Sequence, residues 1–192
     1  MNVRAKAALF AVVAVAQIAA PVFMIVKREI ALRHGVAYKF KTQPVDPADV
    51  FRGRYVQLAI AEDTAPLRKG HTFEYGQTLY AARAVGDEGF AKFTGVTTTP
   101  PPGADYVTTT VTYIDYENLI AHLDIPFDRY YLDEDLAPDA ERLYMAHSET
   151  AQHDAYVTVR VRNGFAVLEE LYIADTPILD YIAQQAAEEG GS

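Results

Sequence analysis

Side chains able to act as nucleophiles are few in this 192-residue chain. The sequence contains no cysteine, and its two serines are Ser148 and Ser192. A serine nucleophile needs a neighbouring base such as lysine, and no lysine follows Lys92. The sequence therefore argues against thiol and serine catalysis and leaves that role to a threonine or a carboxylate.

One short stretch combines histidines with acidic residues, as metal sites do. Its members are His147, Ser148, Glu149, His153 and Asp154. The two histidines are separated by five residues, which matches no common zinc pattern and does not place both rings on one face of a helix. We interpret the stretch as a solvated helix end that leads into a strand.

The densest acidic group lies just before that stretch. Its members are Asp124, Asp128, Asp133, Glu134 and Asp135. Calcium loops normally have a glycine at their tight turn, and no glycine lies between Gly103 and Gly164. A pair of carboxylates for acid–base catalysis stays open, because only the fold can bring such a pair together. A solvated face is the simpler interpretation, so we expect no metal or cofactor and name no catalytic residue.

The remainder of the chain is organised around residues 44–58. Pro44 and Pro47 fix the backbone and favour extended geometry just before them. Asp46 and Asp49 suit the tight turns that follow, and Gly53 supplies a permissive backbone ahead of a β-rich run. This pattern predicts a structural corner that leads into a strand.

The same stretch resembles the signature of the GDYXXLXY family of membrane-anchored bacterial proteins, a Val-Asp-Pro-x-Asp-hydrophobic-Phe-Arg-Gly-Asp-Tyr run. The matching residues are Val45, Asp46, Pro47, Asp49, Val50, Phe51, Arg52, Gly53, Tyr55 and Leu58. Arg54 replaces the family aspartate and Ile60 replaces the closing tyrosine, so a catalytic role of that aspartate would be lost here. The resemblance continues weakly through 128–131 and 164–173. It implies an N-terminal anchor and a domain outside the cytoplasm, and it assigns no activity.

Three further side chains near these motifs are candidates for binding. Arg52 carries a planar guanidinium suited to carboxylates, and we interpret it as joining the corner to a nearby aspartate, with ligand binding as the alternative. Tyr130 and Tyr131 are interpreted first as packing aromatics and second as contact residues.

Residues 7–26 form an apolar run long enough to cross a hydrocarbon core of about 30 Å. Arg4 and Lys6 precede it, and the flanking charges favour a cytoplasmic N-terminus, residues 1–6. A cleaved signal peptide is the alternative. Gln17 and Pro21 interrupt the run and could mark a face that meets another membrane helix.

Charge is divided unevenly along the chain. Residues 29–99 hold 9 basic and 8 acidic side chains, whereas residues 100–192 hold 4 basic and 18 acidic ones. Nucleic acids and anionic lipid surfaces would be repelled by the second part. The simplest arrangement places the near-neutral part by the membrane and the acidic part outward or toward a basic partner. The alternative is that the acidic charge serves solubility alone.

Hydrophobic alternation and turn residues predict a β-rich domain. Strands are expected at 36–41, 55–62, 73–75, 78–85, 90–96, 106–114, 155–161 and 165–173, the last two joined by a type I′ hairpin at Asn163-Gly164. Helices are expected at 27–34, ended by Gly35, at 138–149 and at 177–187, the last opened by Thr176 as N-cap. Residues 188–192 should fray.

These patterns predict an α+β protein with one transmembrane helix at 7–26, a juxtamembrane segment at 27–35 and one β-rich domain at 36–187. We expect a non-enzymatic accessory or assembly subunit in the cytoplasmic membrane, whose periplasmic domain binds a larger integral-membrane complex. The alternative is an enzyme or a binding module for a metal or small ligand that uses carboxylates. The expected contact residues are Gln17, Pro21, Tyr130, Tyr131, Asp133, Glu134 and Asp135.

Overall fold

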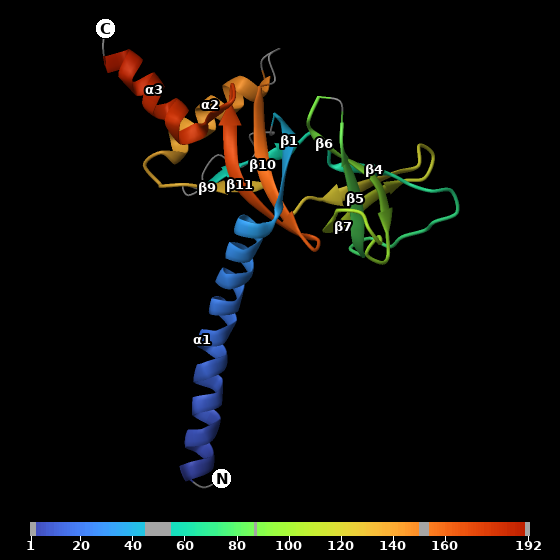
Figure 1. Cartoon of the computed structure of the whole chain (residues 1–192), viewed down its shortest axis with the longest axis vertical. Helices are drawn as coiled ribbons and strands as arrows, with labels where there is room; N and C mark the ends of the chain where they lie inside the picture. The colour runs from blue at the N-terminus through green and yellow to red at the C-terminus, as the bar shows by residue number, and fades with distance from the viewer. Residues whose placement is uncertain (1–2, 45–54, 87, 150–153, 191–192) are drawn as a thin grey trace.

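The computed structural model describes residues 3–44, 55–86, 88–149 and 154–190. It confirms the α+β class: a long apolar helix precedes a β-rich domain, and two shorter helices accompany that domain (Figure 1). Most of the signature, residues 45–54, lies outside the described part, and so does His153.

The helix α1 (Val3–His34) is continuous and projects away from the domain (Figure 1). Among the described residues it is the one helix long and apolar enough to cross a membrane, a test that a signal sequence also passes. Its apolar side chains are exposed over most of its length, whereas Ala31 near its end is 1% exposed. The helix stops before Gly35, as predicted.

The first sheet is antiparallel, in the order β12-β11-β10-β1-β3. Its strands are β1 (Val36–Gln43), β3 (Ala59–Ile60), β10 (Ala155–Arg162), β11 (Phe165–Ile173) and β12 (Thr176–Pro177). Asn163 and Gly164 join β10 to β11 with φ of 49° and 79°, the backbone of the predicted type I′ turn.

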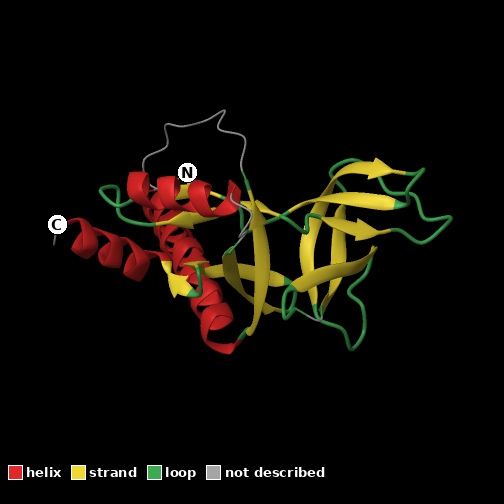
Figure 2. Ribbon diagram, turned by 90° about the horizontal axis from the view of Figure 1, so that it is seen from above, coloured by secondary structure: helices red, strands yellow, loops and turns green. Residues whose placement is uncertain are grey.

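The second sheet has the order β4-β8-β7-β5-β6, and a two-stranded ribbon lies beside the first sheet. The sheet contains β4 (Thr64–Pro66), β5 (Thr78–Val85), β6 (Ala91–Thr97), β7 (Tyr106–Asp115) and β8 (Ile120–Asp124), and the ribbon pairs β2 (Tyr55–Gln57) with β9 (Arg129–Tyr131). The two sheets face each other as a near-barrel (Figure 2).

A single core joins the two sheets. The ring of Phe40 on β1 lies 5.8 Å from that of Phe93 on β6 and 5.0 Å from that of Phe127, centroid to centroid. Tilted aromatic pairs at such distances add to the burial of apolar area. Phe40 is 0% exposed, so β1 lies at the centre of the domain.

The two shorter helices lie against the first sheet and the ribbon. They are α2 (Ala137–Glu149) and α3 (Ile178–Gly190). The predicted N-cap at Thr176 is wrong: Thr176 and Pro177 pair with Ile173 and Tyr172 as β12, and α3 begins at Ile178. The helix also continues past the predicted end at residue 187.

Two further strand predictions need correction. Residues 73–75 form no strand and instead enter a turn. The predicted strand 55–62 divides into β2 and β3, because residues 55–57 pair with β9 whereas residues 59–60 pair with β1.

The strands next to α1 bear on the expected division of charge, which stays a prediction. The strands that pack on α1 are β10 and β11, which belong to the acidic second part of the chain. Two of the four basic residues of that part, Arg160 and Arg162, lie on β10 beside the end of α1.

Candidate interaction surface on the signature ribbon

Three signature positions lie in the described part of the chain, and they divide between core and surface. Leu58 and Ile60 are 3% and 4% exposed and belong to the core. Tyr55 is half-buried on β2. Arg52 lies outside the described residues, so its interpretation as joining the corner to an aspartate stays a prediction.

The ribbon that carries Tyr55 has two different faces. Val56 opposite Tyr130 points inward, while Tyr55 opposite Tyr131 and Gln57 opposite Arg129 lie on the outer face. This alternation is what an antiparallel pair with one buried face requires. Val56 is 0% exposed and Tyr131 is 64% exposed.

Aromatic and charged groups gather on that outer face. The Tyr55 and Tyr131 rings lie 5.5 Å apart, and the Arg129 guanidinium carbon lies 5.5 Å from the Tyr55 centroid. Asp128 accepts a hydrogen bond from the Gln57 amide at 3.1 Å, and its carboxylate lies 3.8 Å from Arg129 Nε. We call Tyr55, Gln57, Asp128, Arg129 and Tyr131 the ribbon surface.

The guanidinium of Arg129 is held in its charged form. Hydrogen bonding to Tyr131 and the charge of Asp128 both raise the pKa of Arg129 above its usual value. The ribbon surface therefore offers a cation beside the Tyr55 ring.

Tyr130 and Tyr131 have different roles, although the sequence treats them alike. Tyr130 is 9% exposed, and its hydroxyl donates to the Glu170 carboxylate on β11 at 2.5 Å. Burial, and then this hydrogen bond, raise the pKa of Tyr130 well above its usual value. Tyr130 thus ties the ribbon to the first sheet, and Tyr131 is left at the surface.

The acidic residues predicted as contacts follow the ribbon directly. Asp133, Glu134 and Asp135 are exposed in the turn between β9 and α2, and the Asp133 carbonyl accepts the N–H groups of Leu136 and Ala137. Gln17 and Pro21, the other predicted contacts, are exposed on α1, far from the ribbon.

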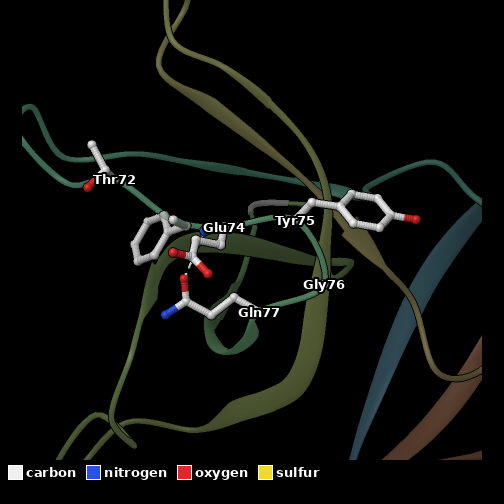
Figure 3. Close-up of a pocket in the computed structure, with 6 residues that line it drawn as sticks. Thr72, Glu74, Tyr75, Gly76 and Gln77 are labelled. Atoms are coloured by element: carbon white, nitrogen blue, oxygen red, sulfur yellow. Dashed lines mark hydrogen bonds between the residues drawn. The ribbon is translucent and has the colours of Figure 1, made fainter.

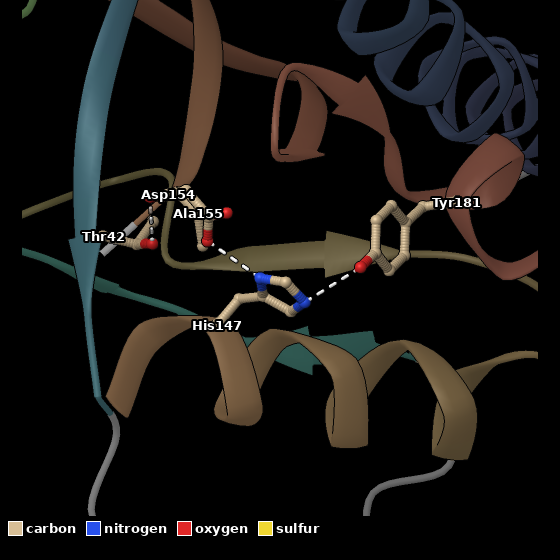
Figure 4. A network of polar contacts seen from close by, with 5 residues as sticks. All are labelled: Thr42, His147, Asp154, Ala155 and Tyr181. Atoms are coloured by element: carbon tan, nitrogen blue, oxygen red, sulfur yellow. Dashed lines mark hydrogen bonds and ion pairs between the residues drawn. The ribbon is translucent and has the colours of Figure 1, made fainter. Parts of the chain in front are cut away.

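The histidine stretch is not the solvated helix end that we expected. His147 Nδ1 lies 2.8 Å from the Asp154 carboxylate, and its Nε2 lies 3.1 Å from the Tyr181 hydroxyl (Figure 4). An ionised carboxylate can only accept, so Asp154 favours the imidazole with its proton on Nδ1. These contacts join α2 and α3 to the residue before β10, and Ser148 beside them is 0% exposed. The network has a structural role.

Groups of three or more potential metal-binding side chains do not occur within the described residues. A hollow of about 740 Å³ lies at residues 72–77, before β5. It is open and shallow, and the Glu74 N–H donates to the Gln77 side chain within it (Figure 3). The hollow contains no ribbon residue, and Tyr75 points away from its other side chains (Figure 3).

Sequence reasoning missed Arg83, a buried charged residue. The side chain of Arg83 is 0% exposed, its guanidinium carbon lies 3.0 Å from the Tyr38 ring centroid, and Nη2 lies 3.4 Å from the Asp105 carboxylate. Burial lowers the pKa of Arg83, and the charges of Tyr38 and Asp105 oppose that shift. Alternation of Leu79, Ala81 and Arg83 along β5 was a signal that the arginine points inward.

The fold and the ribbon define a class of protein in which one apolar helix carries a compact β-rich domain with an aromatic outer ribbon. The family model described as "GDYXXLXY protein" matches residues 17–171. The chain belongs to the GDYXXLXY family. Comparisons with curated proteins and with solved structures gave no match.

Proposed function

We propose that this protein is a membrane-anchored accessory or assembly subunit, and that its ribbon surface binds a larger integral-membrane complex. The helix α1 is the anchor in this proposal, and the β-rich domain lies in the periplasm. The observation that carries the proposal is the outer-face pair of half-buried Tyr55 on β2 and exposed Tyr131 on β9, with Arg129 beside the Tyr55 ring.

The composition of the ribbon surface is that of a protein-binding surface. Tyrosine and arginine are enriched in interfaces and among the residues whose truncation weakens binding most. Tyr131 exposes 64% of its area although its ring contacts the tilted ring of Tyr55. The acidic turn 133–135 adjoins it and would form a charged rim.

The anchor offers a second contact for the same partner. Gln17 and Ala31 are fourteen residues apart, which places them within about 40° of each other around the helix axis. Ala31 faces the domain and is 1% exposed, so Gln17 lies on roughly the side of α1 that carries the domain. A partner helix that hydrogen-bonds to Gln17 would thus lie beneath the β-rich domain.

The test is purification of the tagged full chain from membranes in a mild detergent, followed by mass spectrometry of bound proteins. A membrane protein in fixed stoichiometry is expected, and Tyr131→Ala or Gln17→Leu should reduce its recovery. Tyr113→Ala is the matched control, since Tyr113 is 62% exposed on β7 of the second sheet. A lone, monodisperse chain would contradict the proposal.

Periplasmic placement has its own test, because the chain lacks cysteine. Lys69→Cys, in an exposed turn, should react with an impermeant maleimide in intact cells, while Lys6→Cys should react only after lysis. The reverse pattern would place the domain in the cytoplasm.

The alternative is a carboxylate-based enzyme or ligand-binding module. Asp128 accepts a hydrogen bond from Gln57 and lies beside Arg129, an arrangement that serves the ribbon surface. Asp133 is exposed in a turn, and Asp46 and Asp49 lie outside the described residues. Asp128→Asn separates the two functions: an enzyme would lose turnover while keeping its partners, and a subunit would show weaker assembly.

A further inference from the structure

The tip of the β10–β11 hairpin lies beside the last turns of α1 (Figure 1). Lys27 Nζ lies 4.1 Å above the Phe165 ring, at the first residue of β11. Higher on the helix, Arg160 Nη1 donates to the Gly35 carbonyl at 3.3 Å, and Val36 pairs with Val161. Strand β10 thus runs back along the last turns of α1, and the tip of the hairpin lies level with Lys27.

Cations without an acidic partner gather at that level. Arg33 pairs with Glu29, and Arg160 pairs with Glu169 at 2.8 Å, so these four charges are neutralised in pairs. Lys27, Arg28 and Arg162 are exposed and form no ion pair with a described acidic residue. This end of the domain is basic, although the chain as a whole carries a net charge of −9.

The three cations lie where the apolar surface of α1 ends. The run 7–26 stops one residue before Lys27, and its large side chains, such as Phe23 and Ile25, are more than 60% exposed. A lipid beside the helix would place its acyl chains against this run and its phosphate near residue 27. Arginine forks and lysine ammonium groups bind phosphate oxygens through charge-assisted hydrogen bonds.

We propose that Lys27, Arg28 and Arg162 form a binding surface for the phosphate groups of anionic phospholipids. The inference rests on the anchor assigned to α1 under the proposed function, and it concerns a surface distinct from the ribbon. Its consequence is that the acidic protein is held close to an anionic membrane by a local basic patch. The hairpin tip then contacts the lipid headgroups, and the domain lies directly against them.

The first experiment measures lipid selectivity on the full chain purified in detergent. Phosphatidylglycerol and phosphatidylcholine with identical acyl chains are titrated, and retained lipid is counted by native mass spectrometry. Phosphatidylglycerol is expected to bind more tightly, and Arg28→Gln with Arg162→Gln should reduce that preference about fivefold per cation removed. The matched control is Arg68→Gln with Lys69→Gln, two exposed cations after β4 that form no ion pair with a described acidic residue.

Equal retention of the two lipids by the unaltered chain would overturn the inference, and so would an unchanged preference in the Arg28/Arg162 double variant. Loss of a protein partner in that variant, with lipid preference intact, would assign the patch to protein binding and also overturn it. Partner recovery in the Tyr131→Ala variant tests the proposed subunit function independently, so failure of either idea can be recognised.

The second experiment locates the hairpin tip in a bilayer. The chain contains no tryptophan, so Phe165→Trp gives a single tryptophan at the tip, whose fluorescence can be excited selectively. In vesicles, lipids with a nitroxide on the headgroup should quench it, and lipids brominated near the acyl-chain end should not. Tyr113→Trp on the second sheet is the control and should stay unquenched. Equal, weak quenching at both positions would show that the tip does not reach the headgroups.

Discussion

The guanidinium of Arg83 is buried between the two sheets, where its stacking on Tyr38 and its ion pair with Asp105 oppose the cost of burial. Arg83→Ala removes this packing and should lower the free energy of unfolding by about 2–4 kcal/mol. Arg83→Met fills most of the volume without a charge and should cost less than about 1 kcal/mol. Chemical denaturation in detergent measures both. A Met variant as unstable as the Ala variant would show that the charge itself is needed.

Tyr130 makes the free energy of unfolding depend on pH in the alkaline range. Its pKa is raised in the folded state, so the unfolded chain releases this proton first, near pH 10. Below pH 10 both states are protonated and the contribution to stability is fully present. Above it, stability should fall by up to about 1.4 kcal/mol per pH unit for this group. Tyr130→Phe should make the decline shallower between pH 10 and 11, measured by denaturation at each pH.

The Tyr130→Phe variant also loses the hydrogen bond to Glu170, so it should be less stable by about 1–3 kcal/mol at neutral pH. Tyr113→Phe is the control, because that hydroxyl is exposed to water in the folded state as well. A pH slope identical in the two variants would contradict the role given to Tyr130.

The sequence predicted the placement of only some of the individual side chains. It named Tyr130 and Tyr131 together, yet strand alternation sends one to the core and the other to the surface, and that assignment requires the pairing of β2 with β9. It also placed His147 in solvent. That ring is part-buried and bonded to Asp154, just before β10, and to Tyr181 on α3. Sequence spacing does not reveal which segments the fold brings beside the end of α2.

Among elements, the junction between α1 and β1 is closely packed at Gly35. A Cβ there would lie 2.4 Å from the Ala31 carbonyl oxygen and 3.2 Å from Arg160 Cβ. Gly35→Ala should therefore destabilise the protein by about 1–3 kcal/mol, as overpacking usually does. Gly95→Ala on β6 is the matched control, since its Cβ would find only Pro66 O, at 3.8 Å. Thermal unfolding in detergent compares them, and equal melting temperatures would contradict a rigid junction.

Long elements were predictable and short ones were not. The segment 78–85 coincides with β5, and the Asn163-Gly164 turn was found because its φ angles demand those residue types. The strands β4 and β9 hold three residues each, too few to show alternation. Thr176-Pro177 carries the residue types of a helix start, but pairing with β11 overrides that local preference.

For the whole molecule, the β-rich domain should fold without the apolar part of α1. The exposed side chains of residues 9–26 belong to no core cluster, and burial on α1 begins near Ala31. A chain that starts at Lys27 should be soluble and should keep the free energy of unfolding within about 0.5 kcal/mol, as expected when only surface contacts are lost. Denaturation of both forms in the same detergent measures this. Aggregation of the shortened chain would instead assign the helix a part in the core.

Because α1 continues almost directly into β1, the helix also determines which way the β-rich domain faces. Each residue of α1 turns the chain by about 100° and advances it about 1.5 Å. In the proposed membrane-anchored arrangement, the number of residues between the apolar run and Gly35 therefore sets the direction in which the ribbon surface faces around the axis of α1. One alanine inserted after Val26 would leave the domain contacts that follow Gly35 in place. It would rotate the ribbon surface by about 100° relative to Gln17, and so away from a partner bound at Gln17.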